Sequence, residues 1–124
     1  MALPSNRPLN EVYITGHMAD LATASDTAYL VATHRGRLKR AYSVIANAIT
    51  TANGSISVKV RGTTVGTITV TQSSSAAGDV DTVYLGYQGT NNFVNEGDLI
   101  TFVSDGAADT TTITRCTAVI ERSN

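Results

Sequence analysis

Few side chains in this sequence could act as a nucleophile, a base or a metal ligand. The chain has two histidines, His17 and His34, and a single cysteine, Cys116. Nucleophilic catalysis needs a nucleophile, a base and an orienting group within reach of one another. Both histidines fall in expected loops near the N-terminus, and Arg115 should point away from Cys116 across a strand. No Cys/His spacing predicts zinc, and no Gly-rich loop predicts phosphate binding. We therefore expect a protein that is not an enzyme and that carries no cofactor.

The acidic residues occur in pairs within turn-like segments. The pairs are Asp79 with Asp81, Glu96 with Asp98, and Asp105 with Asp109. Calcium takes oxygen ligands from irregular backbone, so a calcium site is one alternative. The spacing does not match an EF-hand loop, and acidic side chains in turns usually bond their own backbone. We expect turn formers rather than metal ligands.

Aromatic and amide side chains gather between residues 84 and 93. The members are Tyr84, Tyr87 and Phe93, with Asn91 and Asn92 between them. Aromatic rings beside amides can stack on sugars, as in a carbohydrate-binding module, although packing in the core or in loops also explains them. The absence of tryptophan favours packing.

Residues 34–40 hold four of the nine Lys and Arg residues: Arg35, Arg37, Lys39 and Arg40. They fit either a solvated strand face after a turn at Gly36 or a contact with an acidic surface. The net charge of −1 and the 15% of charged residues give no overall field toward nucleic acid or membrane. We expect neither as a partner, and no small-molecule substrate.

Strand periodicity is clearest between Ser55 and Thr71. Ile56, Val58 and Val60 alternate with polar residues, and Ile68 and Val70 do the same after a break at residues 62–64. Val65 has the wrong parity to share their face, and a β-bulge at Gly66 would supply the shift. This pattern predicts an antiparallel hairpin at the centre of an all-β domain.

Further short strands are expected at turn spacings typical of sandwiches. They cover residues 12–15, 27–33, 38–49, 81–87, 99–103 and 110–121. The fold class is all-β: a single-domain antiparallel β-sandwich, jelly-roll-like, over residues 12–124. The expected core comprises Ile56, Val58, Val60, Ile68, Val70, Leu99, Ile100, Phe102, Val119 and Ile120, with Cys116 as a small buried hydrophobe.

Residues 1–11 contain both prolines, Pro4 and Pro8, with Leu3 and Leu9 as isolated apolar residues. Proline favours extended backbone, so this segment predicts an extended N-terminal arm. The arm is either a frayed terminus or a segment that lies along a neighbouring molecule. No signal peptide is evident at Met1, so synthesis in a cytoplasm is expected.

Five short motifs carry a resemblance between residues 38 and 122. They are Ala48–Ala52 (AITTA), Ser74–Val80 (SSAAGDV), Val94–Ile100 (VNEGDLI), Ser104–Ala107 (SDGA) and Val119–Arg122 (VIER). In this order the chain resembles small tailed-bacteriophage capsid decoration, or cement, proteins. Each motif alone is common β-turn chemistry; their order and spacing carry the likeness.

The resemblance implies a non-enzymatic virion protein that binds the exterior of a phage capsid and stabilises contacts between capsomers. It implies the major capsid protein as partner and a homotrimer, since repeated shallow contacts gain avidity through symmetry. The expected capsid contacts are Leu3, Pro4, Arg7, Pro8 and Leu9 of the arm, with Arg35, Arg37, Lys39 and Arg40. The alternative function is a glycan-binding β-sandwich module, displayed on a virion or attached to a hydrolase.

Overall fold

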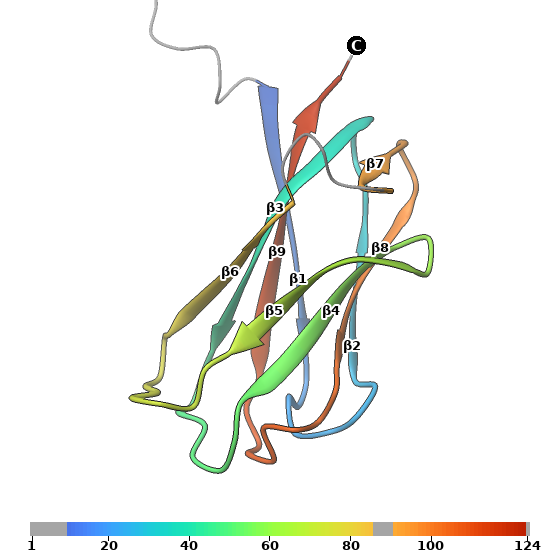
Figure 1. Cartoon of the computed structure of the whole chain (residues 1–124). Helices are drawn as coiled ribbons and strands as arrows, with labels where there is room; N and C mark the ends of the chain where they lie inside the picture. Colours follow the sequence, from blue (N-terminus) through green and yellow to red (C-terminus); the bar gives the residue numbers. More distant parts are fainter. Residues whose placement is uncertain (1–9, 86–90, 124) are drawn as a thin grey trace, which may run out of the picture.

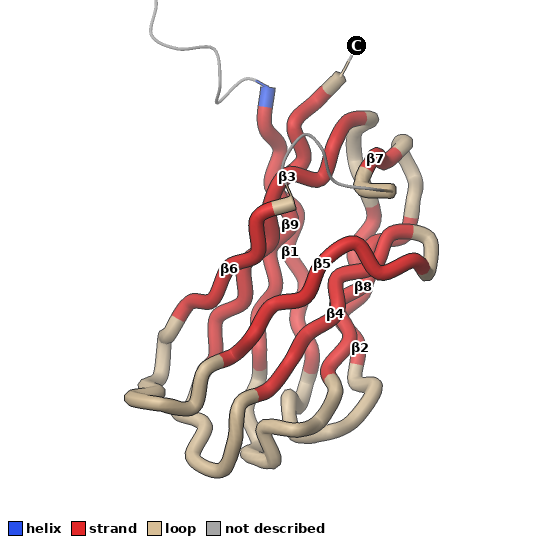
Figure 2. Tube along the Cα trace, in the orientation of Figure 1, coloured by secondary structure: helices blue, strands red, loops and turns tan. Residues whose placement is uncertain are grey.

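The computed structural model describes residues 10–85 and 91–123, which form strands packed as two antiparallel sheets (Figures 1 and 2). The strands in these ranges are β1 (Glu11–Met18), β2 (Thr27–Val31), β3 (Gly36–Ile45), β4 (Gly54–Val60), β5 (Thr63–Val70), β6 (Val80–Tyr84), β7 (Phe93–Val94), β8 (Leu99–Ser104) and β9 (Thr114–Arg122).

Each sheet pairs strands that lie far apart in the sequence. The first sheet has the order β1-β9-β3-β6, and β7 pairs with the start of β3. The second sheet has the order β2-β8-β4-β5. The first and last long strands, β1 and β9, therefore lie side by side (Figure 1). This arrangement confirms the predicted all-β, jelly-roll-like sandwich.

The β4–β5 hairpin follows the predicted alternation. Ile56, Val58, Val60, Ile68 and Val70 are all buried, and the polar residues between them face outward.

The turn and the position of this hairpin differ from prediction. Its turn is Arg61–Gly62, with φ of 52° and 84°, so the chain pairs again at Thr63 instead of breaking over residues 62–64. Two positive φ values define the tight turn that suits the twist of a hairpin. The predicted bulge is present: Val58 pairs with Gly66 and Lys59 with Thr64, which leaves Val65 as the extra residue. The hairpin lies at one edge of its sheet, with β5 as the edge strand, and not at its centre.

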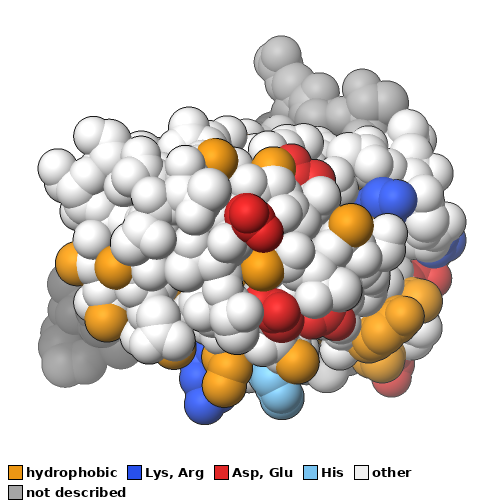
Figure 3. Space-filling model, turned by 90° about the horizontal axis from the view of Figure 1, so that it is seen from below, with side chains coloured by type: hydrophobic (Ala, Val, Ile, Leu, Met, Phe, Trp, Pro, Cys, Tyr) orange, Lys and Arg blue, Asp and Glu red, His pale blue; other side chains and the backbone are white. Residues whose placement is uncertain are grey.

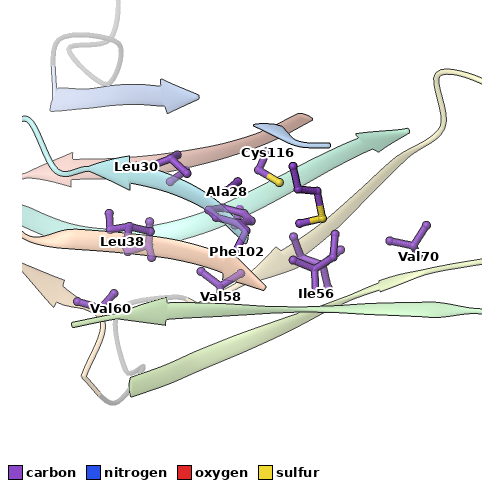
Figure 4. Close-up of a cluster of buried hydrophobic side chains, with 14 of the residues drawn as sticks. Ala28, Leu30, Leu38, Ile56, Val58, Val60, Val70, Phe102 and Cys116 are labelled. Atoms are coloured by element: carbon purple, nitrogen blue, oxygen red, sulfur yellow. The ribbon is translucent and has the colours of Figure 1, made fainter. Parts of the chain in front are cut away.

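The core fills the space between the sheets. Phe102 and Ile56 meet Leu38 and Cys116 of the opposite sheet within one buried cluster (Figure 4). Nine of the ten predicted core residues are buried, and the exception is Leu99, which is 44% exposed. The neighbouring Ile100 and Phe102 point inward, so strand alternation turns Leu99 to solvent.

The N-terminal strand extends further than predicted. β1 continues through Gly16 to Met18, which is buried together with Leu21, whereas the predicted strand ended at residue 15. The predicted arm, residues 1–11, lies almost wholly outside the described residues, and Glu11 is the first residue of β1. Within the described ranges, the chain forms no helix of the length and apolar character that crossing a membrane requires.

Candidate functional site

The histidines and the cysteine do not meet. His17 lies on the outer face of β1, opposite Arg115, whereas Cys116 is fully buried in the core. His34 is exposed in the β2–β3 connection and bonds the Thr33 hydroxyl. Burial raises the pKa of the Cys116 thiol to about 12. A buried, protonated thiol on the opposite face from His17 cannot serve as its nucleophilic partner.

One carboxylate of each acidic pair bonds the backbone of a turn. Asp79 accepts a bond from the backbone N–H of Ala76 at 2.8 Å, and Asp105 accepts from Ala107 at 2.9 Å. Asp98 accepts from the backbone N–H of Asn95 at 2.8 Å, and this bond, above the contribution of Arg61, lowers its pKa. In residues 10–85 and 91–123, no group of three or more His, Cys, Asp or Glu side chains could hold a metal ion.

The basic residues of segment 34–40 have partners within the molecule. Lys39 lies 3.3 Å from carboxylate oxygens of both Glu11 and Glu121, and Arg40 lies 3.2 Å from Glu11. Arg37 donates to the side-chain oxygen of Asn92 at 3.2 Å.

The fourth cation of the segment, Arg35, also has a partner within the chain, because its guanidinium lies 5.4 Å from the centre of the Phe93 ring. The positive charge of Lys39 and Arg40 is therefore largely compensated inside the chain. The other expected capsid contacts, Leu3, Pro4, Arg7, Pro8 and Leu9, lie outside the described residues.

The aromatic and amide residues of segment 84–93 separate. Asn92 is buried, and its amide donates to the backbone oxygen of Leu38 at 2.9 Å, so it anchors a loop. Phe93 is half-buried in β7 under Arg35. Tyr87 lies outside the described residues. Of this set, Tyr84 presents an open ring, 76% exposed on β6.

Tyr84 belongs to a larger group on the outer face of the first sheet, which we call the tyrosine face. Strand register aligns one row of outward-pointing residues across the sheet, in which Val119 is fully covered: Tyr13, Val119, Arg40 and Tyr84. The next row comprises Thr15, Thr117, Tyr42 and Thr82.

The rings of the tyrosine face differ in exposure and are spread across the sheet. Tyr13 is 59% exposed at one edge and Tyr84 is exposed at the other, with half-buried Tyr42 diagonal to Tyr84. Three strand spacings separate Tyr13 from Tyr84, about 14 Å. The face is therefore long enough for an extended ligand and carries aromatic rings at both ends.

A hydrogen-bond network orders this face. Arg40 donates from Nε to the hydroxyl of Tyr42 at 2.7 Å and from its terminal nitrogens to both oxygens of Glu11. The hydroxyl of Tyr13 donates to Glu11 at 3.3 Å. The hydrogen bond from Arg40 is the main reason that the pKa of Glu11 is lowered, against a smaller opposing effect of burial. Tyr13 and Tyr42 are thus tied to one charged pair.

Sequence reasoning missed Tyr13 and Tyr42 as partners of Tyr84. Their association depends on the strand order β1-β9-β3-β6 and on a bulge between Leu38 and Arg40 in β3. The one local signal in the sequence is that the apolar residues of the predicted strand 38–49 fall on both faces, which is compatible with a bulge.

The end of the sandwich that lies at the bottom of Figure 1 has fewer features of a binding site than the tyrosine face. Seen from below in Figure 3, this end is covered mainly by uncharged polar side chains and backbone, with hydrophobic side chains singly or in small groups. The tyrosine face therefore remains the strongest candidate site among the described residues.

No family model and no curated protein sequence matches this chain. Solved structures do share its fold. A CBM36-1 domain of a multidomain xylanase from the hindgut metagenome of Trinervitermes trinervoides has a TM-score of 0.57 and 13% identity, over 88% of this chain and 96% of that one. A CBM35 from Cellvibrio japonicus Abf62 has a TM-score of 0.55 and 12% identity, over 91% and 98%. CsCBM6-3 from Clostridium stercorarium, in complex with cellobiose, has a TM-score of 0.52 and 15% identity, over 81% and 70%.

These structures overturn the main functional prediction. The named domains that share this fold are carbohydrate-binding modules and not capsid proteins, so the prediction of a capsid-stabilising protein is corrected. The physical reason for the error is that four of the five motifs lie at connections between strands and the fifth is the end of β9, features that unrelated β-sandwiches share. The predicted homotrimer and virion location find no support in these comparisons.

Proposed function

We propose that this chain is a glycan-binding module whose tyrosine face holds an extended saccharide. The observation that carries the proposal is the placement of Tyr13 and Tyr84, 59% and 76% exposed, on one ordered sheet face. Large exposed rings on a fixed scaffold are poor contributors to folding and good contributors to binding.

The chemistry of the face suits a sugar. Tyrosine rings offer flat apolar surface to the C–H side of a pyranose, and their hydroxyls offer hydrogen bonds. The second row adds the hydroxyls of Thr15, Thr117 and Thr82. Ligand sites characteristically combine apolar contact with a few placed polar groups.

The network through Arg40 and Glu11 supports binding by preorganisation. Both Tyr13 and Tyr42 have their hydroxyls bonded within the face before any ligand arrives. Side chains that are already ordered lose less conformational entropy on binding, so more of the contact energy appears as affinity.

The likeness to a module in complex with cellobiose and to a module from a xylanase sets the first probes. We would titrate the full chain with cello- and xylo-oligosaccharides by calorimetry and by tyrosine fluorescence, which is readable because the chain lacks tryptophan. We expect saturable binding that Tyr84→Ala or Tyr13→Ala weakens about tenfold, equivalent to the loss of about 1.4 kcal/mol.

The chain offers a matched control. Tyr29 is 70% exposed on the outer face of β2, in the other sheet, so Tyr29→Ala removes an equally open ring elsewhere. Binding that Tyr29→Ala leaves intact and the tyrosine-face variants weaken supports the proposal. Absence of binding to both the cello- and the xylo-oligosaccharides, or loss of binding only with Tyr29→Ala, contradicts the proposal.

A further inference from the structure

Arg115 carries a charge that the described residues do not compensate. It is exposed on the outer face of β9, and no Asp or Glu in residues 10–85 and 91–123 forms an ion pair with it. This contrasts with Lys39 and Arg40 on the same sheet, whose charges face Glu11 and Glu121. Among the described residues, Arg115 is therefore an unpaired cation on this sheet, and the nearest strand with carboxylates at the same end is β6, where Asp79 and Asp81 flank Val80.

A shallow hollow adjoins Arg115. Its volume is about 150 Å³, and it is lined by Val44, Ile45, Ala46, Ile113 and Arg115. The side chains of Val44, Ala46 and Ile113 are apolar and Ile113 is half exposed, whereas the Ile45 side chain points into the core. An apolar floor with one cation at its edge suits a ring that has an apolar side and an anionic substituent.

The hollow continues the tyrosine face. Arg115 lies directly opposite Val44, two residues along β3 from Tyr42 and on the same side of the sheet. The separation along the strand is about 7 Å. A saccharide seated on Tyr42 and Tyr84 would therefore place a neighbouring ring at the hollow. His17, opposite Arg115 on β1, borders the other side and can offer a hydrogen bond.

We propose that the Arg115 hollow is a subsite for an acidic sugar residue, resting on the proposed glycan-binding function of the tyrosine face. The anionic group is the carboxylate of a uronic acid or a sulfate ester. The guanidinium of Arg115 takes the anionic oxygens through parallel N–H···O bonds, and Val44 and Ile113 contact the C–H side of the ring.

The test compares ligands that differ only in the anionic group. The three probes are a cello-oligosaccharide, the same chain oxidised at C6 to a cellouronate, and the same chain sulfated at C6. We expect the full chain to bind one or both anionic forms about tenfold more tightly than the neutral form at low salt. This difference in affinity should shrink as the salt concentration is raised, because the ion pair between Arg115 and the anionic group is exposed to solvent. The form with the larger advantage identifies the anionic group.

Arg115→Gln should bring the ratio of the anionic to the neutral affinity down to about one. Lys59→Gln, on the outer face of β4 in the other sheet, removes one positive charge in the same way and should keep the ratio. A ratio near one in the unmodified protein, or one that survives in Arg115→Gln, overturns the subsite. If neutral binding still depends on Tyr84, the glycan-binding function stands without it. Failure of all three ligands to bind overturns the subsite, and failure of the xylo-oligosaccharides as well overturns the glycan-binding function.

Discussion

Arg40 lies directly opposite Tyr84 in the β3–β6 pair, and its guanidinium reaches across the sheet to Glu11 of β1. Its Nε also donates to the hydroxyl of Tyr42, two residues along the same strand. A single side chain therefore joins one edge of the first sheet to the centre of the tyrosine face. We infer that Arg40 positions the face, with the bond to Glu11 fixing its own rotamer.

Arg40→Lys should weaken glycan binding while keeping the charge. Lysine lacks the planar fork that bonds Glu11 and Tyr42 together, so the face loses order rather than charge. We expect cello-oligosaccharide affinity to fall about fivefold to tenfold, measured by calorimetry. Arg61→Lys, at the β4–β5 turn near Asp98, is the matched control and should bind as before. Unchanged affinity in Arg40→Lys would show that the fork is dispensable.

Glu11→Gln should destabilise the sandwich at neutral pH and have less effect in acid. The pKa of Glu11 is lowered in the fold, chiefly by the bond from Arg40, so its carboxylate adds stability above the unfolded value of about 4.3. That contribution disappears as pH falls through the lower folded pKa. We expect a difference of about 1 kcal/mol in unfolding free energy at pH 7, because both partners keep some solvent contact. Urea unfolding at pH 7 and pH 2.5 measures it, and an equal difference at both values would contradict the argument.

The inner face of the sandwich could be predicted well because strand alternation reports burial directly. Ile56, Val58 and Val60 follow the two-residue period, and Gly66 marked the bulge that shifts Val65. Even Leu99 could have been placed correctly by parity with Ile100. The apolar character of Leu99 suggested a core position. In a strand, however, adjacent side chains point to opposite faces, so an inward Ile100 requires an outward Leu99.

The candidate site could not be predicted in the same way. Tyr13, Tyr42 and Tyr84 share a face only because β9 inserts between β1 and β3, and that order is set by long-range packing. The bulge at Lys39 turns Lys39 and Arg40 outward together, and Tyr42 then follows Arg40 by strand alternation. The cluster of Tyr84 with Phe93 and Asn92 was a plausible local alternative, and sequence proximity misled because Asn92 is a buried anchor.

Gly36→Ala should disrupt the start of β3. A Cβ at Gly36 would lie 2.1 Å from the backbone oxygen of Glu121, and backbone in a paired sheet cannot move aside cheaply. We expect a loss of about 3 kcal/mol or more in unfolding free energy. Gly16→Ala is the control, since its Cβ meets the end of the Leu30 side chain at 3.1 Å and should be tolerated far better. Thermal and urea unfolding measure both variants, and similar losses would refute the backbone clash.

Cys116 should be inert until the protein unfolds. Its side chain is fully buried between the sheets, and burial raises the pKa of the thiol to about 12, so almost no thiolate exists at pH 8. A disulfide reagent such as DTNB should react negligibly with the folded chain and with one thiol per chain in guanidinium. Val58→Ala is a positive control, because it leaves a cavity in the buried cluster that contains Cys116. We expect this variant to react faster with DTNB, since the cavity promotes local opening. Rapid stoichiometric reaction of the unmodified folded protein would mean that Cys116 is accessible, and the packing of β9 against the second sheet would need revision.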